Sequence, residues 1–222
     1  MSEDLDPRSD IPTFLAAGHA SAEAERWVEA AAAWINAAIL GSPEGADLAR
    51  RVAPQHLKPL ADDGDVEAQS LLAEILMDKP TPETVPMAVD YARRAAEAGH
   101  ATGLRHLGLI YGSGLGVAAD RSRAVELLQQ AAANGDGRAA LLVAGLDAGG
   151  KQPMSLTHDE CIRLLDKGVV STVLAQQGVV IADRLMVAQR DEEALKWYVW
   201  AAEHGNEGAK ETVAAMRDNL SQ

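Results

Sequence analysis

Residues 91–135 have the sequence YARRAAEAGHATGLRHLGLIYGSGLGVAADRSRAVELLQQAAANG. The order of apolar, small and turn-forming residues predicts a helix, a tight turn, a second helix, a glycine-rich turn and a third helix. The stretch also nearly repeats itself, because an Ala-Ala pair followed by glycine occurs at 95–99 and again at 131–135. The same pattern returns at 201–205. A short period carried through a chain indicates a stacked array of one supersecondary unit.

The same signals, followed outward in both directions, predict an all-α chain. Apolar positions recur at helical spacing, and glycines or prolines end each run. The expected helices are 11–24, 25–40, 66–78, 83–98, 101–111, 120–134, 138–148, 157–170, 173–186, 191–204 and 207–220. Between them, residues 44–64 predict a short, bent pair of helices, because Pro59 would interrupt a regular one.

A specific motif connects the helices of the central pair. It consists of an apolar-small pair, an aromatic residue, a Gly-x-Gly turn, an acidic residue and an alanine: Leu107, Gly108, Tyr111, Gly114, Gly116, Asp120 and Ala124. Gly108 would let two helices approach closely, and Gly114 and Gly116 accept the positive φ of a sharp reversal. Asp120 is placed to cap the helix that follows.

This motif resembles the Sel1-like repeat, a relative of the tetratricopeptide repeat. Residues 193–206 resemble the second half of the same repeat, and the order Gly18, Ala30, Trp34, Ala37, Pro43 resembles a tetratricopeptide unit. The resemblance implies an α/α solenoid of antiparallel helix hairpins wound as a right-handed superhelix. It suggests tetratricopeptide-like hairpins at 11–64 and Sel1-like repeats at 65–205. The charged residues and Pro7 of 1–10 predict a flexible arm, and the polar residues of 206–222 predict a capping helix.

Composition and charge narrow the choice of partners. The 222 residues carry a net charge of −13, with 47% hydrophobic but only 4% aromatic residues. Nucleic acid binding needs a basic surface, so this charge argues against nucleic acid and against an anionic membrane. The N-terminal sequence has no signal-peptide pattern and no run is long enough to span a membrane, so we expect a cytoplasmic protein. The alanine-rich composition suggests a bacterial source.

Catalytic and ligand-binding motifs are sparse, and no cofactor, metal site or catalytic residue is predicted. The single cysteine, Cys161, replaces an alanine of the repeat, so we expect a small buried side chain. His158, Asp159 and Glu160 lie at a helix start, where acidic residues favour the helix dipole and capping. His106 is expected on the surface. The glycine-rich segment 112–116 follows a helix and contains no lysine, unlike a phosphate-binding loop.

The third and fourth units depart from the repeat. Asp147 and Arg184 replace the tyrosine found at position 111, and residues 149–153 replace the Gly-x-Gly turn. A contact between Asp147 and Arg184 is one hypothesis, and exposure of both side chains to water is the alternative. These irregular units could reshape a binding surface.

The first helices of the hairpins are expected to line a concave groove, by analogy with tetratricopeptide arrays. The positions predicted to face that groove and bind a partner are Glu67, Ser70, Glu74, Met77, Thr102, Arg105, Leu109, Arg138 and Leu141, with Ala175 and Ala182 in the fourth unit. They would give an acidic end, a central arginine pair and an apolar stripe. The alternative is that these are ordinary solvent-facing helix positions.

The sequence therefore predicts a non-enzymatic scaffold or adaptor that binds a partner protein or peptide. Bacterial Sel1-like proteins commonly act in this way, so the resemblance implies it. A narrower hypothesis is an inhibitor or immunity-type protein that sequesters a basic toxin or effector, which the acidity would suit. A hydrolase with a site in the irregular third and fourth units and a transcriptional regulator are the hypotheses from other classes.

Overall fold

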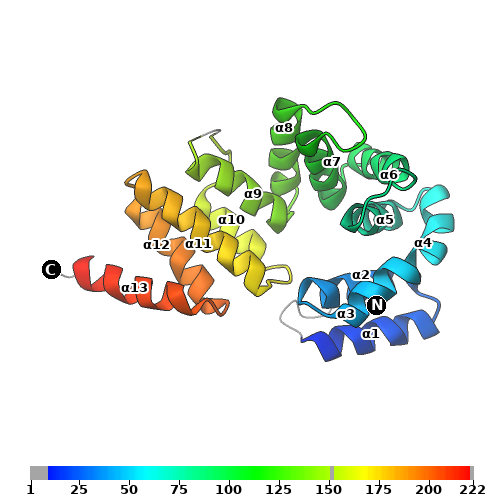
Figure 1. Ribbon diagram of the computed structural model, residues 1–222, viewed down its shortest axis with the longest axis horizontal. Coiled ribbons are helices and arrows are strands. Elements are labelled where there is room, and N and C mark those ends of the chain that lie inside the picture. Colours follow the sequence, from blue (N-terminus) through cyan, green and yellow to red (C-terminus); the bar gives the residue numbers. More distant parts are fainter. Residues whose placement is uncertain (1–9, 151–152, 221–222) are drawn as a thin grey trace. The chain divides into compact units, whose positions relative to one another are not determined.

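A computed structural model of the chain describes residues 10–150 and 153–220 (Figure 1). The predicted arm at 1–10 lies outside the described residues except for Asp10, whose carboxylate accepts a hydrogen bond from the Thr13 backbone N–H and caps the first helix. The described residues form helices and connecting turns, with no strand among them. The predicted all-α fold class is confirmed.

The helices of the described residues follow the predicted order closely. They are α1 (Ile11–Glu23), α2 (Trp27–Ile39), α3 (Pro43–Arg51), α4 (Ala53–Asp62), α5 (Val66–Asp78), α6 (Val85–Glu97), α7 (Ala101–Ser113), α8 (Arg121–Ala133), α9 (Gly137–Ala148), α10 (His158–Leu165), α11 (Thr172–Val187), α12 (Asp191–Glu203) and α13 (Glu207–Leu220). The short pair predicted within 44–64 corresponds to α3 and α4, and Pro59 lies inside α4.

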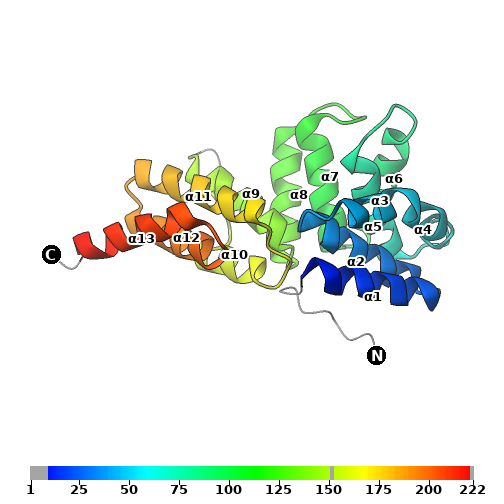
Figure 2. The same cartoon turned by 60° about the horizontal axis from the view of Figure 1, so that its bottom comes forward.

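The chain divides into two compact units, Met1–Asp136 and Gly137–Gln222. In the first unit, α1 packs on α2, α5 on α6 and α7 on α8. The α7–α8 pair lies side by side in both ribbon views (Figures 1 and 2). In the second unit, α9 packs on α10, α11 on α12, and α12 on α13. The division falls inside the predicted 65–205 array, whose boundaries stay a prediction.

Glycine ends the second helix of several hairpins. Gly64, Gly99, Gly135 and Gly205 have φ values of 104°, 77°, 100° and 85°, in the left-handed region that glycine adopts at little cost. Each of these residues therefore reverses the chain after a helix, which gives the sequence its period.

Other glycines let the two helices of a hairpin touch. A Cβ atom on Gly108 would lie 3.1 Å from Leu128 Cγ, and one on Gly178 would lie 2.7 Å from Trp200 Cζ3. On Gly18 it would lie 2.4 Å from Trp34 Nε1. The predicted close approach at Gly108 is confirmed, and the same arrangement occurs at both ends of the array.

Helix α10 is shorter than predicted. The sequence predicts a helix over 157–170, but α10 ends at Leu165. The N–H groups of Lys167 and Gly168 donate to carbonyls three residues earlier, so the last turn tightens and stops. Gly168 and the two β-branched valines after it disfavour continuation of the helix.

The core combines many alanines with a few large side chains. The largest fully buried side chains include Trp34, Trp197, Trp200 and Phe14. Cys161 is fully buried, as predicted. Within the described residues, no helix has the length and apolar character needed to cross a membrane.

Candidate functional site

The predicted partner-binding positions of the first unit lie on α5 and α7, and they differ in accessibility. Glu67 is exposed, and Met77, Thr102 and Leu109 are half-buried. Ser70 and Arg105 are buried, with exposed fractions of 1% and 4%. The predicted surface is therefore only partly available to a partner.

Arg105 belongs to a buried ionic network. Its Nε donates to Asp136 Oδ2 at 2.9 Å, and its Nη2 lies 3.6 Å from Glu74 Oε2. The side chains of Arg105 and Asp136 are only 5% and 6% exposed. Thr102 Oγ1 donates to the same Asp136 oxygen at 3.2 Å. A buried charge needs such partners, so Arg105 on α7 connects α5 to the turn between α8 and α9 and is almost completely shielded from solvent.

Two further polar groups lie beside this network. His106, expected on the surface, is 2% exposed, and its Nε2 lies 3.6 Å from Glu74 Oε2. Ser70 Oγ is buried and has no hydrogen-bond partner among the described residues. At the edge, Glu67 Oε2 lies 2.8 Å from His100 Nε2, which joins α5 to the start of α7. The polar positions of α5 and α7 thus mainly hold the two helices together.

The predicted positions of the second unit lie on α9 and α11. Arg138 is half-buried, and Leu141 is 3% exposed. Ala175 and Ala182 are fully buried. The prediction that these residues face a groove is wrong for Leu141, Ala175 and Ala182, because they pack against other helices of the unit.

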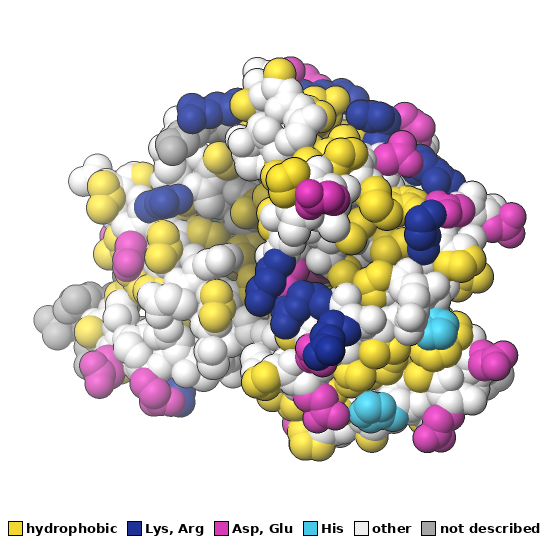
Figure 3. All heavy atoms as spheres, turned by 45° about the vertical axis from the view of Figure 1, so that its right-hand side comes forward, with side chains coloured by type: hydrophobic (Ala, Val, Ile, Leu, Met, Phe, Trp, Pro, Cys, Tyr) yellow, Lys and Arg dark blue, Asp and Glu magenta, His cyan; other side chains and the backbone are white. Residues whose placement is uncertain are grey.

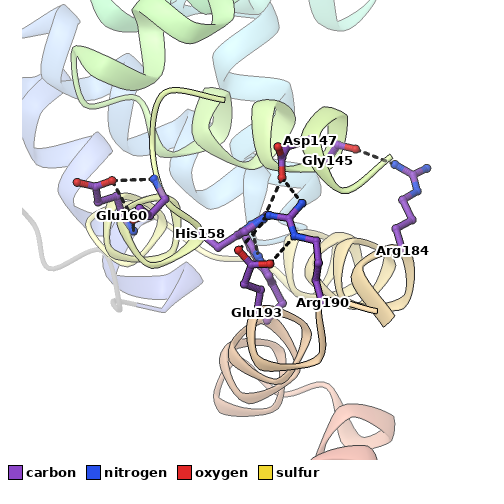
Figure 4. Close-up of polar contacts among 9 residues, drawn as sticks. Gly145, Asp147, His158, Glu160, Arg184, Arg190 and Glu193 are labelled. Atoms are coloured by element: carbon purple, nitrogen blue, oxygen red, sulfur yellow. Dashed lines mark hydrogen bonds and ion pairs between the residues drawn. The ribbon is translucent and has the colours of Figure 1, made fainter. Parts of the chain in front are cut away.

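The predicted contact between Asp147 and Arg184 does not form (Figure 4). Asp147 Oδ2 accepts a hydrogen bond from Arg190 Nη1 at 2.7 Å, whereas Arg184 Nη1 donates to the Gly145 carbonyl at 3.2 Å. The reason is the register of α11. Gly178 makes the close helix contact that Gly108 makes in α7, so Arg184 lies one turn beyond the residue equivalent to Tyr111.

His158 is the centre of a buried polar cluster that the sequence did not reveal. Trp197 Nε1 donates to His158 Nδ1 at 2.8 Å, and His158 Nε2 lies 3.2 Å from Asp147 Oδ2. An indole N–H can only donate, so Nδ1 accepts and a neutral ring carries its proton on Nε2, which lies 3.2 Å from both Asp147 Oδ2 and Arg190 Nη2. Burial is the main reason that the pKa of His158 is lowered.

Arg190 and Glu193 form the ionic part of this cluster, whereas Thr157 and Glu160, which cap α10, do not belong to it. Arg190 Nη2 also donates a hydrogen bond to Glu193 Oε1 at 2.9 Å, and this contact lowers the pKa of Glu193 (Figure 4). Thr157 and Glu160 form a capping box at the start of α10, so the predicted capping role belongs to Glu160. His158, which the sequence assigned to the same cap, instead connects α10 to α12.

These environments do not favour catalysis. Burial raises the pKa of the Cys161 thiol to about 12, so it is not a thiolate at neutral pH. Both ring nitrogens of His158 are engaged by fixed neighbours, which leaves no free site for proton transfer to a substrate. In the described part of the chain, no group of three or more His, Cys, Asp or Glu side chains is arranged to hold a metal ion.

One exposed feature was not predicted. Val173, Val180 and Val187 lie on α11 with exposed fractions of 65%, 40% and 87%. Their seven-residue spacing is visible in the sequence, and it places them on one side of a helix. The sequence did not reveal that this side faces solvent, because the buried side of α11 is equally apolar.

The chain was compared with protein-family models, curated protein sequences and solved structures. No protein-family model and no curated protein sequence matches the chain. Among solved structures, a Sel1 repeat protein from Oxalobacter formigenes is 20% identical with a TM-score of 0.51, and the match covers 90% of this chain and 88% of that one.

Two further structures agree. A putative Sel1 repeat protein from Klebsiella pneumoniae is 19% identical with a TM-score of 0.51, covering 94% of this chain and 100% of that one. A protective antigen of uropathogenic Escherichia coli, described as displaying an SLR fold, is 19% identical with a TM-score of 0.54; the match covers 95% of this chain and 50% of the antigen. The chain therefore has the Sel1-like repeat fold, an all-α solenoid of antiparallel helix hairpins.

Proposed function

We propose that this chain is a non-enzymatic scaffold or adaptor that binds a partner protein or peptide. The observation that carries the proposal is the stack of helix hairpins with the Sel1-like fold, an architecture that offers an extended row of helices to a partner. The predicted positions that remain accessible are candidate partner contacts on each unit: Glu67, Met77, Thr102 and Leu109 on the first, and Arg138 on the second. A cytoplasmic location and a bacterial source belong to the same proposal.

An inhibitor or immunity-type protein acting on a basic toxin is the second candidate, supported by the net charge of −13. Its surface would need concentrated negative charge. On the face drawn in Figure 3, acidic, basic and hydrophobic side chains are interspersed, which favours a partner of mixed character. A hydrolase in the irregular units has less support, because neither Cys161 nor His158 is available for chemistry.

Affinity purification from the native cell extract tests the proposal. The wild-type chain is compared with the double variant Glu67→Arg and Leu109→Asp, and with Glu97→Arg as a control on the exposed surface of α6. Circular dichroism first establishes that all three are folded. We expect a partner that the wild type and the control retain and the double variant loses.

Two results decide between the alternatives. A partner whose affinity falls steeply as salt is raised would favour the inhibitor hypothesis, because charge then dominates the interface. Failure of the wild-type chain to retain any partner, under conditions where it remains folded, would count against the scaffold proposal.

A further inference from the structure

The outer side of α11 carries a row of exposed valines. Val173, Val180 and Val187 are 65%, 40% and 87% exposed, and they follow one another at intervals of seven residues. With a rise of 1.5 Å per residue, the row is about 21 Å long. The buried residues Ala175 and Ala182 lie on the other side of the helix. The fold therefore buries one side of α11 and leaves the valines exposed on the other, where the polar residues Gln176 and Gln177 lie between the first two.

This concentration of exposed apolar residues is specific to α11. Among the described residues, the large hydrophobic side chains that are exposed are Leu60 on α4 and four on α11: Val173, Val180, Met186 and Val187. Single exposed hydrophobic residues are common on protein surfaces, whereas α11 alone carries four of the five. Valine is also a weaker helix former than the polar residues that usually occupy such positions, so helix stability does not explain the choice.

A positively charged residue, Arg184, lies beside the row of valines. It lies on the same side of α11, between Val180 and Val187, and its side chain donates to the Gly145 carbonyl. No carboxylate among the described residues forms an ion pair with Arg184. The acidic neighbour Asp183 accepts the hydrogen bond of the Tyr198 hydroxyl from α12. The positive charge on the row is therefore open to a carboxylate from outside.

We propose that the outer side of α11 docks an amphipathic α-helix of a partner protein, with an acidic side chain of that helix against Arg184. This inference rests on the scaffold function proposed above. The N–H and C=O groups of α11 are used within the helix, so a partner cannot add as a β-strand. A row of side chains about 10 Å apart matches the two-turn repeat of a second helix.

A second copy of the chain fits the row less well. Two antiparallel α11 helices centred on Val180 would place Val173 against Val187, which is favourable. The same register would place Arg184 opposite Gln176, whose amide carries no charge and already accepts a hydrogen bond from Asn206. The charge therefore favours a foreign helix that contains a carboxylate.

A synthetic peptide provides the test. The probe is a labelled 21-residue amphipathic helix with leucines along one side and glutamate beside them, and its binding to the full chain is followed by fluorescence anisotropy. We expect saturable binding that Val180→Asp weakens by about tenfold or more, because a charge then enters the apolar contact. Leu60→Asp, the matched change at the exposed hydrophobic residue of α4, should leave the affinity unchanged.

A charge exchange makes the test specific. Arg184→Glu should weaken binding of the glutamate peptide and strengthen binding of the same peptide with lysine in place of glutamate. Absence of binding to the wild type, equal losses in Val180→Asp and Leu60→Asp, or no response to the charge exchange would each overturn the inference. Sedimentation that shows a wild-type dimer lost in Val180→Asp would also overturn it, in favour of a second copy.

The purification experiment separates this inference from the scaffold function. If the folded Val180→Asp chain retains the same partner as the wild type, the scaffold proposal stands and the α11 site is wrong. If the partner is lost from Val180→Asp and kept by Leu60→Asp, both are supported.

Discussion

At the scale of single residues, the stability of this protein depends on whether each buried polar group has a hydrogen-bond partner. Ser70 is 1% exposed and its hydroxyl has no partner among the described residues, whereas Ser42 is 4% exposed and accepts a hydrogen bond from the Gly45 N–H at 3.0 Å. An unpaired buried hydroxyl is destabilising, but a paired one at a helix N-terminus is stabilising. The two serines should therefore respond to the same substitution in opposite directions.

We expect Ser70→Ala to raise the free energy of unfolding by about 0.5–1.5 kcal/mol, because it removes the unpaired hydroxyl and favours the helix. The matched variant Ser42→Ala should lower it by about 1 kcal/mol through loss of the cap. Urea denaturation followed by circular dichroism measures both. A loss of stability in Ser70→Ala would mean that this hydroxyl has a partner, such as an ordered water.

His158 predicts how stability depends on pH. Burial lowers its pKa below the ordinary value of 6.5, so the unfolded chain binds more protons than the folded one between the two pKa values. The stabilisation is complete above pH 6.5 and is lost as the pH falls toward the pKa of the folded state. The effect is about 1.4 kcal/mol for each unit by which the pKa is lowered.

The comparison with His158→Gln isolates this contribution, since glutamine can accept from Trp197 and donate to Asp147 but does not titrate. We expect the difference in unfolding free energy between the two proteins to shrink as the pH is lowered from 7.5 to 5. A difference that stays constant over this range would contradict the lowered pKa of His158.

At the scale of elements, Arg105 on α7 holds together segments that are about 30 residues apart in the sequence. It contacts Glu74 on α5 and Asp136 after α8. Removing one member of a buried ionic network leaves its partners unpaired, so we expect Arg105→Ala to lower the unfolding free energy by about 3–5 kcal/mol. Arg123→Ala removes an exposed pair with Glu126 and should change it by less than about 1 kcal/mol. Thermal denaturation distinguishes the two. A loss of less than about 1 kcal/mol in Arg105→Ala would mean that Arg105 is not a structural residue, and it would again be a candidate for partner binding.

Helices could be predicted from the sequence because their signals are local. Apolar spacing and closing glycines such as Gly99 act within a few residues, and α5 has the predicted bounds. The site could not be predicted as well, because it depends on which side of each helix is covered. The burial of Arg105 requires Asp136, 31 residues away, and the partner of Asp147 is Arg190, 43 residues away. No local pattern contains that information.

At the scale of the whole molecule, the chain divides into two compact units. In repeat arrays, stability arises within units and between sequence neighbours, so a local defect need not spread through the chain. Gly178 lies in the interior of the second unit, where a Cβ atom would be 2.7 Å from Trp200. Gly145, in the same unit, would place its Cβ atom at an ordinary 3.8 Å from Ile181.

We therefore expect Gly178→Ala to lower hydrogen-exchange protection in α11 and α12 by the equivalent of about 1–3 kcal/mol, because the hairpin must open to admit a methyl group. Protection in α1 to α6 should remain close to that of the wild type. Gly145→Ala, which adds the same methyl group where there is room for it, should preserve or raise protection throughout, since alanine favours the helix. Hydrogen exchange with mass spectrometry resolves these segments. A uniform loss of protection across both units in Gly178→Ala would mean that the chain unfolds as one cooperative body, and the scaffold would then transmit a change at α11 to its far end.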